Sequence, residues 1–189
     1  MGARDRELNP AAKMLPFLDL FLVVFVGLAI IYDLRERRIP NWLILVGVLG
    51  GIAVNTTKGL DQLLYSLFGL GLGVGILILP FALGWLGAGD VKLLGAVGSI
   101  LGVSWMPRVF FYSALTGGLL ALYVICFRAR GGVAFGRLWL DLKLFLVSRG
   151  GVVPGPAIGT RSCVPLGVAI GLGTLIAFYL DPGGRWAGF

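Results

Sequence analysis

The chain has no histidine and little charge. Of its 189 residues only 13% are Asp, Glu, Lys or Arg, whereas 58% are hydrophobic and the mean hydropathy is +0.94. Without histidine, imidazole zinc sites, Ser-His-Asp and Cys-His catalysis and haem held by an axial histidine are excluded. The scarcity of charge excludes an ordinary soluble domain and indicates an integral membrane protein.

Cysteine is almost as scarce. The two cysteines, Cys126 and Cys163, are far apart and form no CxxC pair. We therefore expect neither a disulfide nor a zinc knuckle, and interpret both as small buried hydrophobic residues. No metal and no organic cofactor are expected.

Long apolar runs make up most of the chain. At about 20 residues for each crossing, they suffice for roughly six helices and leave little for a soluble domain. We predict one all-α, membrane-embedded domain over residues 1–189, with six transmembrane helices. The predicted spans are Pro16–Tyr32, Trp42–Val54, Leu63–Leu83, Val91–Pro107, Val109–Cys126 and Cys163–Leu180.

Glycines recur four residues apart within these runs, a spacing that lets the backbones of membrane helices approach closely. The pairs are Gly69/Gly73, Gly71/Gly75 and Gly167/Gly171. We expect them at helix contacts.

Basic residues are distributed unevenly between the two predicted sides. Ten of the 16 Lys and Arg residues lie in the first, third and fifth connections or, for Lys92, directly beside one of them. The positive-inside rule then makes these connections cytoplasmic and puts both termini outside, as in a multi-pass protein of the cytoplasmic membrane. Although the pI is about 9.9, the basic residues lie in short connections, so no nucleic-acid partner is expected.

The longest connection, Phe127–Ser162, contains the stretch VAFGRLWLDLKLFLVSR. Its apolar residues at positions 135, 138, 139, 142 and 146 share one helical face. This pattern predicts an interfacial amphipathic helix between the fifth and sixth spans, with membrane lipid as its partner.

Two acids interrupt the apolar pattern. Asp33 lies in IIYDLRERRIPNWL and Asp90 in GAGDVKLLGAVG, both at a membrane boundary on the predicted cytoplasmic side. An acid at such a depth is costly, so a function is the default hypothesis. Two carboxylates can hydrolyse a peptide without histidine, cysteine or metal: the ionised one takes a proton from water, and the protonated one donates to the scissile carbonyl oxygen.

Helix ends favour one assignment of the proton within this pair. Asp90 is expected near a helix N-terminus, where the macrodipole favours an anion, and Asp33 near a C-terminus, where it does not. We therefore expect Asp33 to be protonated more often than Asp90.

Four neighbours complete the candidate site. Gly87 and Gly89 have no side chains, so a peptide substrate and an opposing helix can come close to Asp90. Lys92 either orients a substrate carbonyl or lipid phosphate, or extends its amine to the membrane surface. Asn41 caps the second helix or bonds to the adjacent loop, and capping is the favoured interpretation.

Three stretches resemble one known family. GAGDVKLLGAVG matches the GxGD pattern, and DLRERRIPN resembles the region that carries the first catalytic aspartate in type IV prepilin peptidases. CVPLGVAIGLGTL resembles the closing segment of that family, I-P-Y-G-x-A, with Leu166 where an aromatic residue is common. The resemblance implies a membrane aspartyl protease that removes the leader of prepilins or prepilin-like proteins at the cytoplasmic membrane face, usually just after a glycine, with Asp33 and Asp90 as catalytic residues.

Bifunctional members of that family carry paired CxxC motifs linked to N-methylation. The first connection here is short and has no cysteine, so we expect a peptidase without methyltransferase activity. The compact size resembles the Flp/Tad-type pilin peptidases more than the archaeal preflagellin peptidases. An alternative of another class is a small proton-coupled transporter that uses the two aspartates as a relay, although the sequence shows no repeat symmetry.

Overall fold

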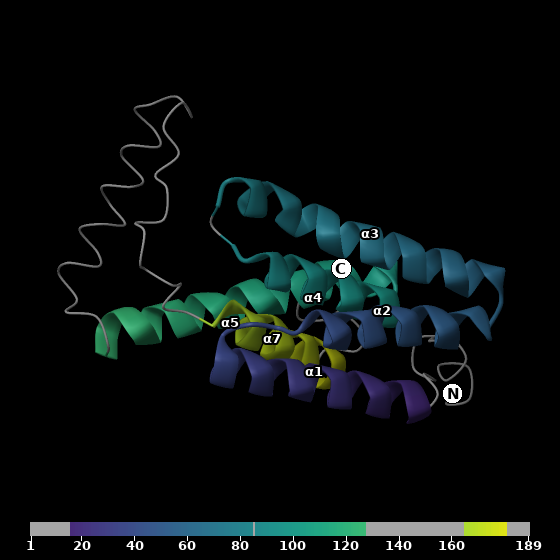
Figure 1. Ribbon diagram of the computed structural model, residues 1–189, viewed down its shortest axis with the longest axis horizontal. Helices are drawn as coiled ribbons and strands as arrows, with labels where there is room; N and C mark the ends of the chain where they lie inside the picture. Colours follow the sequence, from purple (N-terminus) through teal and green to yellow (C-terminus); the bar gives the residue numbers. More distant parts are fainter. Residues whose placement is uncertain (1–15, 85, 128–164, 181–189) are drawn as a thin grey trace, which may run out of the picture.

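The computed structural model describes residues 16–84, 86–127 and 165–180 (Figure 1). Within these ranges the chain is all-α, as predicted, and contains no strand. The elements are α1 (Pro16–Glu36), α2 (Asn41–Thr56), α3 (Leu60–Ala82), α4 (Ala88–Leu101), the 3-10 turn η2 (Val103–Trp105), α5 (Met106–Phe127) and α7 (Leu166–Leu180). The helices run along the long axis of one bundle.

Each predicted span coincides largely with a helix, but the helix lengths differ. Two helical segments, Leu60–Ala82 and Val103–Val124, are long and apolar enough to cross a membrane, whereas α2 and α7 are shorter apolar helices. The helix predicted over 91–107 begins at Ala88 and ends at Leu101, because Gly102 adopts a φ of 86° that favours glycine. The amphipathic helix predicted over 127–162 and the side chains of both cysteines lie outside the described residues.

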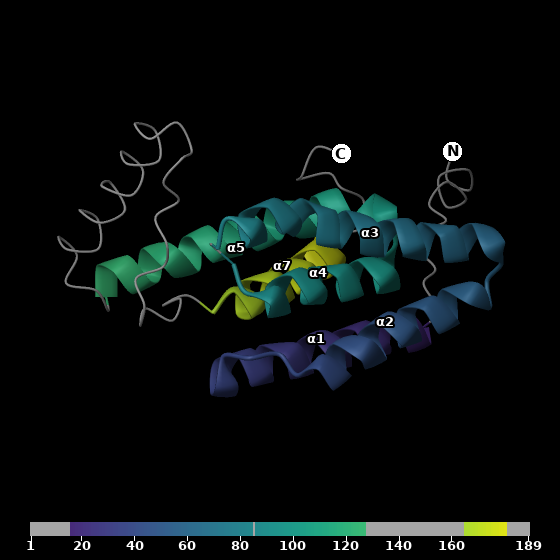
Figure 2. The same cartoon turned by 45° about the horizontal axis from the view of Figure 1, so that its top comes forward.

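The short helix α4 forms the centre of the bundle. Every residue from Leu93 to Leu101 is buried, and α4 contacts α2, α3 and α7. Figure 2 shows α4 and α7 between α3 and α5 on one side and α1 and α2 on the other. The outer faces of the helices expose large apolar side chains such as Leu64, Phe68 and Leu79, as expected of helices that face lipid.

Glycines bring α3 and α4 into backbone contact. A Cβ atom on Gly69 would overlap the carbonyl oxygen of Gly98, and one on Gly98 would overlap the carbonyl oxygen of Gly69. A Cβ on Gly73 would lie 2.6 Å from the carbonyl oxygen of Leu94. The predicted role of the Gly69/Gly73 pair in packing is therefore confirmed.

The two other glycine pairs have opposite outcomes. The Gly167/Gly171 pair faces α1, where a Cβ on Gly171 would meet the side chains of Ile30 and Val26. The prediction for Gly71 and Gly75 is wrong, because a Cβ on either would have nothing within 4 Å. Residues two apart on a helix point in different directions, so both pairs on α3 cannot face α4.

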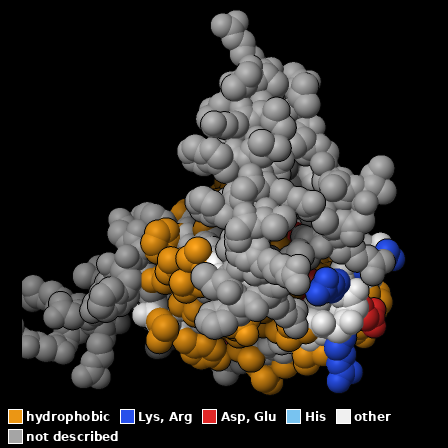
Figure 3. Space-filling model, turned by 90° about the vertical axis from the view of Figure 1, so that its left-hand side faces the viewer, with side chains coloured by type: hydrophobic (Ala, Val, Ile, Leu, Met, Phe, Trp, Pro, Cys, Tyr) orange, Lys and Arg blue, Asp and Glu red, His pale blue; other side chains and the backbone are white. Residues whose placement is uncertain are grey.

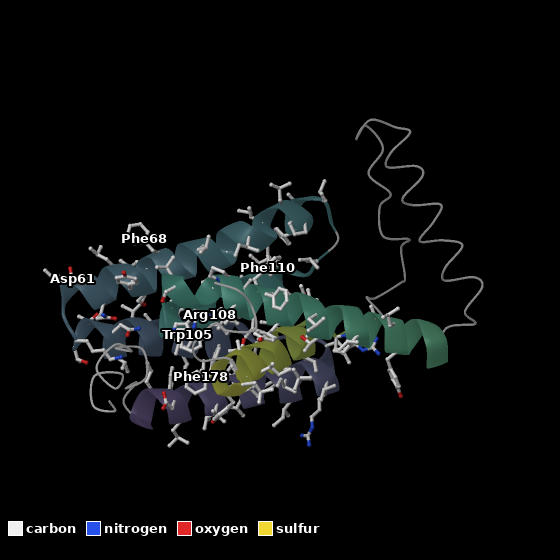
Figure 4. The ribbon with its side chains drawn as sticks, turned by 180° about the vertical axis from the view of Figure 1, so that it is seen from behind. Asp61, Phe68, Trp105, Arg108, Phe110 and Phe178 are labelled. Carbon is white, nitrogen blue, oxygen red and sulfur yellow. The ribbon has the colours of Figure 1, made fainter. Side chains whose placement is uncertain are left out.

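Aromatic residues join η2 and α5 to α7. The guanidinium carbon of Arg108 lies 5.1 Å from the centre of the Trp105 ring, and that ring lies 5.8 Å from the ring of Phe178. Figure 4 shows these three side chains near one another. The contact adds to the packing of α5 on α7.

Polar side chains close the C-terminal end of α4. The amide of Asn55 donates hydrogen bonds to the carbonyl oxygens of Ser99 (3.1 Å) and Ile100 (3.2 Å), and the hydroxyl of Ser66 donates to Ser99 O (2.6 Å). These carbonyl groups belong to the last turn, which has no helical partner for them. Asn55 and Ser66 thus satisfy buried acceptors that would otherwise be costly in an apolar bundle.

Asn55→Ala is expected to lower the free energy of unfolding by about 1–2 kcal/mol, because the buried carbonyl group of Ile100 loses its side-chain donor and that of Ser99 keeps only the Ser66 hydroxyl. The measurement is thermal unfolding of the purified protein in detergent. Thr56→Ala is the matched control, since the exposed Thr56 hydroxyl bonds only to Ile52 O in its own helix. Equal destabilisation by the two variants would contradict this role for Asn55.

Candidate active site

Asp33 and Asp90 lie at the same end of the bundle. Asp33 is in the last turn of α1 and Asp90 in the first turn of α4, at the end where α2 and α7 also begin (Figure 1). The two carboxylates are close enough for the charge of Asp33 to act on Asp90. The predicted juxtaposition of the two acids on one side is therefore present in the structure.

The N-terminus of α7 holds the carboxylate of Asp33. The Val168 N–H donates a hydrogen bond to Asp33 Oδ2 (2.9 Å), and the Gly167 N–H also donates to this carboxylate. These N–H groups belong to the first turn of α7, where no helical acceptor exists. Since Pro165 precedes the helix and has no polar side chain, Asp33 acts as the cap of α7 from a different helix.

Asp90 has a similar arrangement within its own helix. It is the third residue of α4, and its Oδ2 accepts a hydrogen bond from the N–H of Gly87 (3.2 Å). An acid at this position reaches back to the start of its helix, as in a capping box. Asp33 is 7% exposed and Asp90 is partly exposed, so solvent reaches the pair from the side of Asp90.

Both carboxylates therefore lie at a helix N-terminus, where N–H groups and the dipole favour an anion. We expected Asp33 to carry the proton more often because it lies near the C-terminus of α1. The N-terminus of α7 also reaches Asp33, however, and supplies two donors to it. The two acids differ less in their helix environment than the sequence indicated.

Glycines and one isoleucine shape the space around the pair. A Cβ on Gly167 would lie 2.7 Å from Asp33 Oδ2 and 3.1 Å from Ile39 Cδ1. A Cβ on Gly89 would lie 3.8 Å from Ile39 Cβ, and one on Gly87 would lie 3.2 Å from Asp90 Oδ2. Ile39 therefore lies close to the glycine beside each carboxylate.

Lys92 and Asn41 meet at the rim. The Lys92 amine donates a hydrogen bond to Asn41 Oδ1 (3.1 Å), which joins α4 to the first residue of α2, and both side chains are exposed. The favoured interpretation of Asn41 as a cap is wrong. Pro40 occupies the N-cap position of α2, and no side chain bonds there.

The same rim carries a cluster of positive charge. Arg35, Arg37, Arg38 and Lys92 are all exposed. Figure 3 looks onto this end and shows Lys and Arg side chains beside an apolar flank. Arg37 adopts a φ of 51° and its N–H bonds to Asp33 O (3.1 Å), so the turn that closes α1 starts at the acid.

Sequence reasoning did not assign Ile39, Gly167 or Val168 to the site. The signal for the last two was the closing segment CVPLGVAIGLGTL, whose place beside Asp33 only the structure shows. In the ranges that the structure describes, no group of three Asp, Glu or Cys residues could hold a metal ion.

Comparison with known proteins supports the relationship that the motifs suggested. Residues 20–122, more than half of the chain, match the type IV leader peptidase family. Over 108 residues the chain is 34% identical to the prepilin leader peptidase/N-methyltransferase of Bacillus subtilis (strain 168), a match that covers 54% of this chain and 44% of that protein. The chain thus spans less than half of that relative. No solved structure matches it.

The matched region includes both acids, the connection between α1 and α2, and the GxGD stretch. These are the segments that form most of the site described above. From the extent of this match, the chain belongs to the type IV leader peptidase family.

Proposed function

We propose that the protein is a membrane aspartyl endopeptidase that removes the leader peptide of a prepilin or prepilin-like protein at the cytoplasmic membrane face. The observation that carries the proposal is the pairing of Asp33 and Asp90 from two helices at one end of the bundle, within electrostatic reach of each other. The family and the named relative support the same reaction. The proposed enzyme needs no metal or organic cofactor.

The proposed chemistry uses one proton shared by the pair. Since two like charges at short range disfavour double ionisation, one carboxylate is ionised and the other protonated. The ionised acid takes a proton from water as the water oxygen attacks the scissile carbonyl carbon, and the protonated acid donates to the carbonyl oxygen. The acid that received the water proton then gives it to the leaving nitrogen, and the other acid takes a proton back from a hydroxyl group of the tetrahedral intermediate as the C–N bond breaks. Both acids thereby return to their starting states.

Other parts of the site have proposed supporting roles. The bare backbone at Gly87 and Gly89 admits an extended peptide beside Asp90. Lys92 orients a substrate carbonyl or a lipid phosphate at the rim. The proposal covers leader cleavage alone and does not include methyl transfer, because the connection between α1 and α2, residues 37–40, is short and has no cysteine.

Gly89→Ala separates a substrate role from a packing role. A Cβ at this position would make only an ordinary contact with Ile39, at 3.8 Å, so we expect the melting temperature to change little. If substrate occupies this space, KM for leader cleavage should rise by about tenfold, as for a misfit of one methyl group. Unchanged cleavage kinetics would show that substrate does not use the space above Gly89.

A cleavage assay tests the proposed function directly. The purified protein in lipid nanodiscs is incubated with a prepilin, and the new N-terminus is identified by mass spectrometry. We expect release of an intact leader at a single bond, with chelators having no effect. A proton-coupled transporter, the alternative from the sequence, would leave the leader intact and would instead carry protons across a proteoliposome membrane.

A further inference from the structure

The described residues offer several features that the proposed reaction does not explain. The polar cluster around Asn55 closes the end of α4, and the apolar outer faces are those expected toward lipid. The contact between Asp33 and α7 is different, because it involves one of the two proposed catalytic acids. Helix α7 contributes no acid of its own, yet its N-terminus bonds directly to Asp33. This contact also explains why glycine occupies position 167.

We propose that the N-terminus of α7 keeps Asp33 as the ionised member of the pair and fixes its orientation, with Gly167 and Val168 as positioning residues. This inference depends on the proposed peptidase function. Asp90 is then the member that carries the proton and donates it to the scissile carbonyl oxygen. The assignment reverses the one expected from the sequence.

Hydrogen bonding is the first support. Both N–H groups that reach Asp33 come from the first turn of α7 and have no other acceptor in the helix. Hydrogen bonds from backbone N–H groups favour the charged form of a carboxylate, and the positive end of the helix dipole acts in the same direction. Asp90, by comparison, accepts a hydrogen bond from a single backbone N–H, that of Gly87.

The close approach of the Asp33 carboxylate to Gly167 is the second support for this inference. A Cβ on Gly167 would lie 2.7 Å from Oδ2 and 2.9 Å from Cγ of Asp33, closer than real contacts allow. Only glycine therefore lets the carboxylate approach the helix end. At Gly171, one turn further along the same face, a Cβ would meet apolar side chains of α1 and not the acid.

The charged groups that face Asp33 are few among the described residues. They are Asp90 from α4 and Arg37 from the turn after α1, whereas residues 166–180 of α7 contain no charged side chain. Neither charged group is altered in the variants below. A change in pH dependence would therefore report the donors of α7.

Val168→Pro is the sharpest test, because it removes the backbone N–H that donates to Asp33. That N–H has no acceptor within the helix, and proline is tolerated in the first turn of a helix. Val168→Ala is its control, since it loses side-chain packing but keeps the N–H. We expect kcat for leader cleavage to fall about tenfold to a hundredfold in Val168→Pro, as for a lost hydrogen bond to a charged group, with KM unchanged. The acid limb of the pH profile should move to higher pH, because the ionised acid is less well stabilised.

A second pair of variants, Gly167→Ala and its control Gly171→Ala, tests the same inference without introducing proline. Gly167→Ala should shift the acid limb in the same direction as Val168→Pro, whereas Gly171→Ala should lower the melting temperature and leave the limb unchanged. If Gly167→Ala and the folded Val168→Pro protein both keep the parent pH profile, the inference is wrong. Absence of cleavage by the parent protein would instead reject the peptidase function itself.

Discussion

Asp33→Asn and Asp90→Asn should each abolish leader cleavage while leaving a folded protein. Asparagine keeps the side-chain oxygen that accepts the N–H of Val168 or Gly87, so each helix end remains capped. It cannot serve as the base or the acid of the proposed reaction. We expect kcat to fall by about 10⁴-fold or more, because members of a catalytic pair act as a unit.

The measurement is single-turnover cleavage of a prepilin, with thermal unfolding of each variant as the test of folding. Asp61→Asn is the matched control, because Asp61 is also an acid in the first turn of a helix, α3. Figure 4 shows that it lies at the opposite end of the bundle from the start of α7. Cleavage by either dyad variant at the parent rate would reject the proposed chemistry.

Asp33→Ala adds a distinction between the two roles of this residue. It removes both the acid and the cap of α7, so we expect it to lose activity like Asp33→Asn and also to unfold at a lower temperature. A purely structural Asp33 would give a different pattern. Asp33→Asn would then remain active, and only Asp33→Ala would be impaired.

Gly69→Ala and Gly98→Ala should each strongly destabilise the fold. A Cβ on either glycine would overlap backbone atoms of the facing helix, and backbone cannot move aside as a flexible side chain can. We expect a loss of about 3 kcal/mol or more, at the upper end of the costs of overpacking. The expected observations are a much lower melting temperature and aggregation on extraction from the membrane.

Gly71→Ala and Gly75→Ala are the controls for these variants. Both glycines are in α3, and an added Cβ would have nothing within 4 Å. Alanine is also the better helix former by up to about 1 kcal/mol, so these variants should be at least as stable as the parent. Destabilisation of all four variants to the same extent would contradict the backbone contact between α3 and α4.

Much of the site followed from local sequence. Asp33 and Asp90 were identified because a carboxylate among apolar residues is costly, and charge in the connections placed both on one side. The bond between Lys92 and Asn41 was not foreseen, although both residues had been singled out. Asn41 was interpreted as a cap because that is the usual role of asparagine near a helix start, whereas Pro40 takes the N-cap position.

The sequence by itself determined the protein class, the helical segments and the two acids, since apolar run length, charge and the GxGD stretch are local properties. Only the tertiary structure decided which glycines touch another helix. The glycines of α3 look alike in the sequence, but alternate ones point in different directions, and only some of them face a neighbouring helix. It alone brought Val168 to Asp33, a residue 135 positions away. A hydrogen bond across that separation depends on how α1 and α7 pack, which neither segment encodes on its own.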